Sequence, residues 1–422
     1  MEKESKFEFS FTEFELKLKT KPFYALFFNL VILSLFFFQA LRAYLPGVYV
    51  AMSHVVFYEN IIENLLILIT LVFFALPGLT NTICKKVGLK RVLMFSIYSI
   101  AVGRLLIAFH LPNIWQTIFS GIIIAFYGVF ISIFLTLWVD DENFKIKLNN
   151  KIILVVFSIL CALLLDYLIR TIGFSQDISL LPPGLLAEFW YITQYIWLFI
   201  QIPLTALCIY FTITYFPRFE IASNSEEKHK PDKKSTRYSL IFVGIGMIWF
   251  LLFNIFLYPN IIALYTATSY YINNFLSIIA LIVTILILLC VRSEHLSNIK
   301  LVVILNSIMI VSICLFLFIG RVITYFASIL VMISLIIMYL DFFLLFSKMS
   351  TINFKWEKVK TISNAFAISL VFYILFTVLH IFTTDWAQII AAFKGYGPII
   401  ILLASILLVA STIISLSLNY RR

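Results

Sequence analysis

Long apolar runs separated by short polar segments occupy almost the whole chain. Because a helix needs about 20 mostly apolar residues to cross a bilayer, each run is interpreted as one transmembrane helix. The runs cover residues 22–44, 60–79, 92–109, 114–138, 152–172, 188–216, 238–258, 269–291, 301–319, 322–346, 361–382 and 397–418. The pattern therefore predicts an all-α, polytopic membrane protein with 12 transmembrane helices.

The longest polar segment divides these runs into two sets of six. Residues 217–237 read PRFEIASNSEEKHKPDKKSTR, a sequence too charged and too poor in apolar side chains to pack into a core. We therefore expect an N-terminal six-helix bundle at 22–216, a linker at 217–237 and a C-terminal six-helix bundle at 238–422. No repeat of individual residues relates the halves, so the division rests on the number of runs.

The first 21 residues form a separate segment before the first apolar run. Their large apolar side chains recur at helical spacing, at Phe7, Phe11, Phe14 and Leu18. We expect residues 1–21 to form an amphipathic helix on the cytoplasmic membrane surface, with a strand or a disordered tail as alternatives. No small-residue cleavage site follows, so the segment does not resemble a removable signal peptide.

The positions of the basic residues predict the orientation of the chain. If the N-terminus is cytoplasmic, 26 of the 31 Lys and Arg residues fall in segments on the cytoplasmic side. The positive-inside rule therefore predicts a multi-pass protein of the cell membrane with both termini and the linker in the cytoplasm. The exceptions are Arg42, Arg104, Arg170, Arg321 and Lys394.

Composition narrows the class of protein further. Hydrophobic residues make up 62% of the chain and charged residues 12%, which leaves no room for a sizeable soluble domain. The net charge of +10 follows from the cytoplasmic loops, so we expect no nucleic-acid partner. Histidines and cysteines are scattered, and no phosphate-binding glycine loop or catalytic motif is present. We therefore expect no metal, no cofactor and no enzymatic activity.

Ionisable residues at membrane depth are the candidate functional residues, because such positions are costly unless they face a cavity or a partner. The first half contains six charges that all fall in the outer third of the bilayer or at its edge: Arg42, Glu63, Arg104, Asp166, Arg170 and Glu188. One interpretation is a set of structural ion pairs. The other is an outward-facing polar pocket in which Arg42, Arg104 and Arg170 hold an anionic group, since a guanidinium offers a planar fork of donors. The candidate substrate-binding residues are Arg42, Arg104, Asp166, Arg170, Glu63 and Gln39.

One loop resembles a known transporter signature. Residues 85–106 read KKVGLKRVLMFSIYSIAVGRLL, with a glycine followed by basic residues before the third apolar run. This is similar to the loop motif of the major facilitator superfamily, although the usual acidic residue and the second glycine are absent. The resemblance implies a fold of two six-helix bundles and secondary transport.

A narrower resemblance covers about the first 180 residues. It is carried by FFFQALRAYLP (36–46), the GLKRVL and GRLL pieces of the loop, and LLLDYLIRTIGFSQDISL (163–180). These segments are similar to the membrane domain of proteins that carry an endonuclease/exonuclease/phosphatase domain, and to partner proteins of GPI-anchor remodelling. The resemblance implies lipid handling, but this chain has no phosphatase domain after its last run, so hydrolysis is not implied.

Two functions follow from these patterns. The first is a facilitator-like secondary transporter of an amphiphilic or anionic substrate, including a lipid-like one, by alternating access. The second is a non-transporting membrane scaffold that binds a lipid and presents it to a partner, such as a phosphatase or a lipid-remodelling enzyme. The scarcity of carboxylates near the membrane centre favours the scaffold, since proton-coupled carriers need an acid to titrate.

Overall fold

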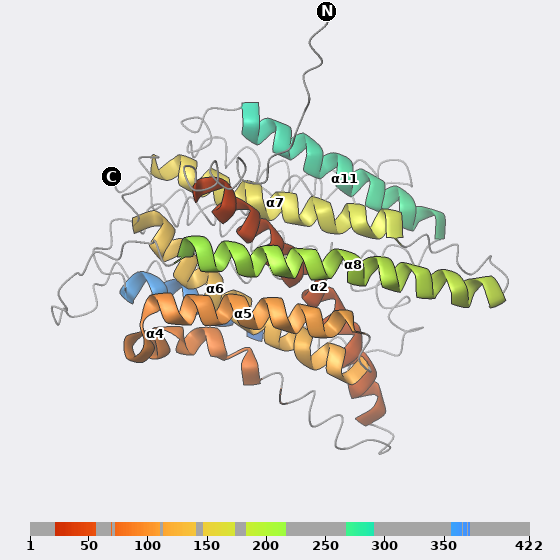
Figure 1. Cartoon of the computed structure of the whole chain (residues 1–422), viewed down its shortest axis with the longest axis horizontal. Helices are drawn as coiled ribbons and strands as arrows, with labels where there is room; N and C mark the ends of the chain where they lie inside the picture. The colour runs from red at the N-terminus through yellow and green to blue at the C-terminus, as the bar shows by residue number, and fades with distance from the viewer. Residues whose placement is uncertain are drawn as a thin grey trace, which may run out of the picture.

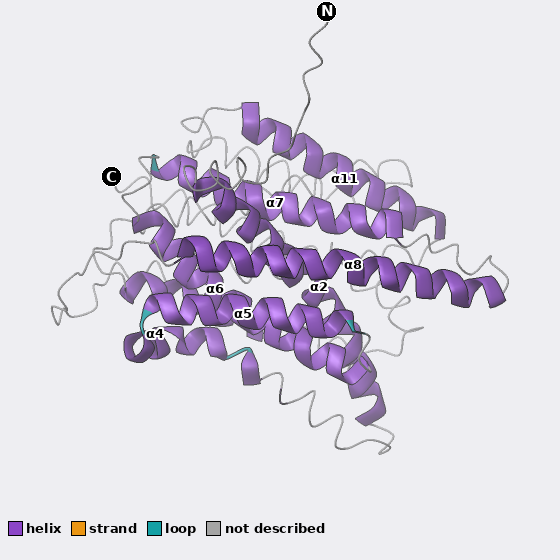
Figure 2. Cartoon of the chain, in the orientation of Figure 1, coloured by secondary structure: helices purple, strands orange, loops and turns teal. Residues whose placement is uncertain are grey.

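The structure is a computed structural model that describes most of the first half of the chain and two parts of the second half. The described residues are 22–55, 69, 72–109, 113–140, 147–173, 183–216, 267–290, 356–364, 366–368, 370 and 371. All regular secondary structure in these residues is helical (Figures 1 and 2). The helices are α2 (Pro22–Val55), α4 (Leu76–Val87), α5 (Leu89–Ala108), α6 (Asn113–Asp140), α7 (Leu148–Gly173), α8 (Pro183–Tyr215) and α11 (Ala267–Cys290).

Four of the predicted transmembrane helices of the first half are confirmed, but the run at 60–79 is interrupted by a turn at Phe74 and Ala75 before α4 begins at Leu76. Four described helices are long and apolar enough to cross a bilayer, within Tyr24–Leu41, Leu89–Ala108, Ile114–Trp138 and Asn150–Ile169. Helix α2 is longer than expected, because it continues through Pro46 to Val55 instead of ending at residue 44. Proline is tolerated inside membrane helices when neighbouring groups satisfy the freed backbone. The linker and most of the second set of runs lie outside the described residues.

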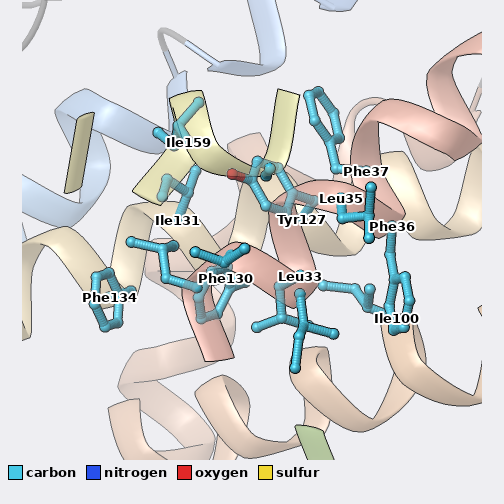
Figure 3. Close-up of a cluster of buried hydrophobic side chains, with 14 of the residues drawn as sticks. Leu33, Leu35, Phe36, Phe37, Ile100, Tyr127, Phe130, Ile131, Phe134 and Ile159 are labelled. Atoms are coloured by element: carbon cyan, nitrogen blue, oxygen red, sulfur yellow. The ribbon is translucent and has the colours of Figure 1, made fainter. Parts of the chain in front are cut away.

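Helix α2 is the centre of the first bundle. It packs against α5, α6, α7 and α8, and every side chain from Asn29 to Leu41 is buried. The segment NLVILSLFFFQAL is mostly apolar, and its three polar side chains, Asn29, Ser34 and Gln39, are buried against the other helices. In Figure 3, Phe36 and Phe37 of α2 lie in one apolar cluster with Tyr127 of α6.

The turn between α4 and α5 depends on one glycine. Gly88 has φ +97°, a conformation that side chains with a Cβ rarely adopt. Its amide donates to the Cys84 carbonyl at 2.8 Å and so closes the end of α4. The glycine of the facilitator-like loop therefore allows the chain to reverse direction between two helices.

Two side chains clamp the end of α6 to the start of α7. The Trp138 indole donates to the Lys151 carbonyl at 3.0 Å, and the Lys151 ammonium donates to the Trp138 carbonyl at 3.1 Å. The ammonium also lies 5.7 Å from the centre of the indole ring. Lys151 is therefore buried with its charge stabilised by a carbonyl and an aromatic face.

Candidate functional site

Two of the predicted charges come together in the first bundle. Arg104 and Asp166 lie on α5 and α7, each within about two turns of the C-terminal end of its helix. The opposite charges of the two side chains act on each other. Asp166 is only 2% exposed, so it faces the bundle and not the lipid. An ion pair between these two residues, and their role in binding a substrate, stay predictions.

The other predicted charges are only partly placed. Arg42 and Arg170 belong to α2 and α7, and Arg170 follows Asp166 by one helical turn. Glu188 belongs to α8, and Glu63 lies outside the described residues. The described structure gives backbone positions, but no side-chain contacts, for Arg42, Arg170 and Glu188. Their contribution to a pocket remains a prediction.

Gln39, the remaining predicted residue, faces α8. The Gln201 amide donates to the Gln39 carbonyl at 3.4 Å, so this contact is long and weak. Gln201 is fully buried and Gln39 is 9% exposed. The Gln39 amide nitrogen, the Gln201 carbonyl oxygen and the nearby Thr205 hydroxyl have no hydrogen-bond partner among the described residues. The pair holds unused donors and acceptors between α2 and α8.

A second polar contact joins α2 and α8 closer to the N-terminal end of α2. Asn29 donates from its amide nitrogen to the Thr212 hydroxyl at 3.1 Å, and its carbonyl accepts from the Cys208 thiol at 2.9 Å. The Thr212 hydroxyl in turn donates to the Cys208 backbone carbonyl at 2.7 Å. All three side chains are fully buried. The amide nitrogen and the carbonyl oxygen of Asn29 each have a hydrogen-bond partner on α8, so the network holds α2 against α8.

The sequence analysis missed this polar stripe on α8. Gln201, Thr205, Cys208 and Thr212 recur at i, i+4, i+7 and i+11, which places them on one helical face. The opposite face exposes apolar side chains such as Phe199 and Ile213, as expected for a helix that faces lipid. The stripe could have been predicted from the sequence, because its uncharged polar residues recur at helical spacing within an apolar run. An average over hydropathy hides it.

The described charges of the site are suited to binding an anionic group. A guanidinium beside a buried carboxylate can hold a carboxylate or phosphate group through paired hydrogen bonds. Within the described ranges, no group of three or more His, Cys, Asp or Glu residues is placed to hold a metal ion. Cys84 and Cys208 are free and buried, as is typical of cysteines that pack like small apolar side chains.

Comparison with known proteins shows a similar fold at low sequence identity. No protein-family model and no curated protein matches the chain. A crystal structure of FucP, a major facilitator superfamily transporter in the outward conformation, is 14% identical, with a TM-score of 0.58, and the match covers 93% of this chain and 98% of that one. A variant of the fucose:proton symporter FucP from E. coli is 13% identical, with the same TM-score of 0.58 and the same coverage of 93% and 98%.

A human protein gives a similar result. The organic anion transporter MFSD10 (TETRAN) is 10% identical, with a TM-score of 0.56, and the match covers 90% of this chain and 97% of that one. At such low identities, the similarity shows the fold alone. The chain is therefore an all-helical membrane protein with the fold of major facilitator superfamily transporters, as the loop resemblance implied. The narrower resemblance to lipid-handling membrane domains stays a prediction.

Proposed function

We propose that the protein is a secondary transporter that moves an anionic, amphiphilic molecule across the membrane by alternating access. The proposal is supported by the burial of Asp166 and by its electrostatic effect on Arg104 inside a bundle of the facilitator fold. A charged pair at membrane depth is costly, and such residues are typical of substrate and ion pathways. The fold supplies two bundles that can rock about a central site.

The surroundings of this pair favour a substrate with a long apolar part. The described core of the first bundle is formed mainly by Phe, Leu, Ile and Val side chains, and its buried polar groups are amides and hydroxyls apart from the charged Lys151 and Asp166. A sugar needs many hydrogen-bond partners, whereas an alkyl chain needs only apolar contact. The guanidinium then serves the anionic end of the substrate. Uptake of a lipid-like anion satisfies both requirements.

Binding of matched detergents tests this specificity. Dodecyl phosphate and dodecyltrimethylammonium share one alkyl chain and differ in headgroup charge. Each is added to the protein in a neutral maltoside detergent, and the thermal unfolding temperature is measured. We expect dodecyl phosphate to raise this temperature and the cationic analogue to leave it unchanged, because only the phosphate is attracted to Arg104.

The matched variants Arg104→Gln and Arg91→Gln separate the site from general charge effects. Both positions lie on α5, but Arg91 is exposed near its start. The Arg104→Gln variant should lose the stabilisation by dodecyl phosphate, and the Arg91→Gln variant should keep it. Equal stabilisation of wild type by both detergents, or equal loss in both variants, would refute the proposed specificity.

A further inference from the structure

Three buried polar side chains lie together where α2 meets α8. Gln39 on α2 contacts Gln201 on α8, and Thr205 follows Gln201 by one turn on the same face of that helix. The two helices pack against each other in the first bundle (Figure 1). Gln201 is 0% exposed, Thr205 3% and Gln39 9%. We call these three residues the glutamine cluster.

The glutamine cluster has more hydrogen-bonding groups than it uses. Among the described residues, no partner is present for the Gln39 amide nitrogen, the Gln201 carbonyl oxygen or the Thr205 hydroxyl. The contact between the two glutamines is 3.4 Å long and contributes little. A buried polar atom without a partner costs free energy, so three of them in one place call for a ligand that both donates and accepts.

The Thr205 hydroxyl differs from the hydroxyls of other buried threonines. Thr136, Thr212 and Thr284 each donate to the backbone carbonyl four residues earlier, at 2.7 to 2.9 Å. Threonine commonly makes this bond inside apolar helices, because it satisfies the hydroxyl without a second helix. Thr205 does not make it. Its hydroxyl is therefore left for a partner outside the backbone of α8.

We propose that the glutamine cluster is a binding site for one buried water molecule that joins α2 to α8. A water molecule can accept from the Gln39 amide, donate to the Gln201 carbonyl and share a third hydrogen bond with the Thr205 hydroxyl. Buried waters make about three hydrogen bonds to protein groups that lack other partners. The 9% exposure of Gln39 means that a sphere of water size already reaches this side chain.

Other ligands match the cluster less well. A metal cation prefers carboxylate oxygens, whereas these three residues carry no charge and one of the unused atoms is an amide nitrogen. A larger organic ligand would need accessible surface, but the three unused atoms are buried. Water therefore fits both the size and the hydrogen-bonding groups of the site.

The site lies where α8 is weakened by a proline. Pro203 stands inside the helix, between Gln201 and Thr205. Proline has no backbone N–H, so one hydrogen bond of the helix, to the Phe199 carbonyl, is lost at this point. A water molecule bound on the opposite face would support α8 against α2 at this position, in addition to the direct bonds of Asn29.

Thr205→Val separates a hydroxyl that binds water from a hydroxyl that is simply unpaired. Removing an unpaired buried hydroxyl should raise stability, whereas removing one that holds a water should lower it. We expect the ratio of folded to unfolded protein to fall about threefold, which corresponds to one hydrogen bond between membrane helices. Unfolding in mixed micelles of neutral detergent and sodium dodecyl sulfate, followed by tryptophan fluorescence, measures this ratio.

Thr284→Val is the matched control. Thr284 is 3% exposed, as Thr205 is, but its hydroxyl donates to the Ala280 carbonyl of its own helix at 2.8 Å. We expect little change in this variant, because the bond lies within one helix and joins no second one. A Thr205→Val protein that is as stable as the Thr284→Val protein, or more stable, would overturn the proposal.

A double variant tests whether Gln39 and Thr205 share one ligand. Gln39→Met keeps the length of the side chain and removes its amide. In this background Thr205→Val should lose more than half of its effect, because the water has already lost a partner; additive effects would contradict a shared water. If Thr205→Val does not fold, Thr205→Ser and Thr205→Ala decide. Both lack the methyl group, so a more stable serine variant supports the site and an equally stable alanine variant contradicts it.

A cryo-electron microscopy map of the protein in nanodiscs, at a resolution that shows ordered water, observes the ligand directly. We expect one isolated peak within hydrogen-bonding distance of Gln39, Gln201 and Thr205, and no such peak in the double variant. Side chains that bond directly to one another with no peak between them, or density too long for a water, would overturn the proposal. None of these measurements uses a substrate, so the site and the proposed transport function can fail separately.

Discussion

Replacing Asn29 tests the polar network that joins α2 to α8. The Asn29 side chain is fully buried, and it makes one hydrogen bond to Thr212 and accepts one from Cys208. Asn29→Ala removes both bonds and leaves a small cavity. Asn29→Leu removes the same bonds but fills most of the space. The comparison therefore separates hydrogen bonding from packing.

The expected magnitude follows from the membrane environment. Hydrogen bonds between helices in a membrane contribute about 0.6 kcal/mol each, so the loss of two bonds costs about 1.2 kcal/mol. A cavity of at least methyl size adds about 1 kcal/mol. We expect the free energy of unfolding to fall by about 2 kcal/mol in Asn29→Ala and by about 1 kcal/mol in Asn29→Leu.

Unfolding in mixed micelles of neutral detergent and sodium dodecyl sulfate measures these changes. The fluorescence of the seven tryptophans reports the transition. Cys208→Ser is the control, because a hydroxyl retains the donor that Asn29 accepts, and its stability should stay close to that of wild type. An Asn29→Leu protein as stable as wild type, or more stable, would refute the assignment of this network as stabilising.

Three further predictions concern individual contacts. Asp166→Asn and Arg104→Gln should each lower the thermal unfolding temperature, because each change leaves the other charge buried without its counter-charge; an unchanged temperature for either variant in differential scanning fluorimetry would contradict a paired arrangement. Gly88→Ala should cost about 1 kcal/mol in micelle unfolding, because alanine is strained at φ +97°, and a neutral result would contradict the required glycine conformation. Trp138→Phe removes one of the two reciprocal hydrogen bonds to Lys151 and should cost about 1 kcal/mol, with no change in stability as the opposing result.

Depth along the sequence predicted that Arg104 and Asp166 lie at one level of the bundle, and the structure shows that Asp166 is buried. Both residues lie late in the third and fifth apolar runs, which cross the membrane in the same direction. The number of runs alone therefore places both residues at the same depth in the membrane. The energetic cost of a charge in lipid then required an inward orientation. The run at 22–44 predicted helix α2 but not its central place in the bundle, because an apolar helix in a membrane can face lipid as well as other helices.

Contacts between uncharged groups were not predictable in the same way. The Asn29 network and the Gln39 pair depend on the rotation of α8 against α2, which a hydropathy profile does not contain. The end of α2 was placed too early, because the helix was taken to end with its apolar run at residue 44, whereas it continues through Pro46, which membrane helices tolerate.

Movement of an anionic lipid across a membrane tests the central claim most directly. The protein is reconstituted into vesicles that contain phosphatidic acid with a fluorescent NBD group on a short acyl chain, and dithionite is added to destroy the label in the outer leaflet. The account predicts that wild-type and Arg91→Gln protein bring inner-leaflet label to the outside, so that fluorescence continues to fall, whereas Arg104→Gln protein does so much more slowly. A wild-type trace identical to that of protein-free vesicles, with the inner-leaflet label protected, would contradict transport of this class of substrate and favour a lipid-binding scaffold.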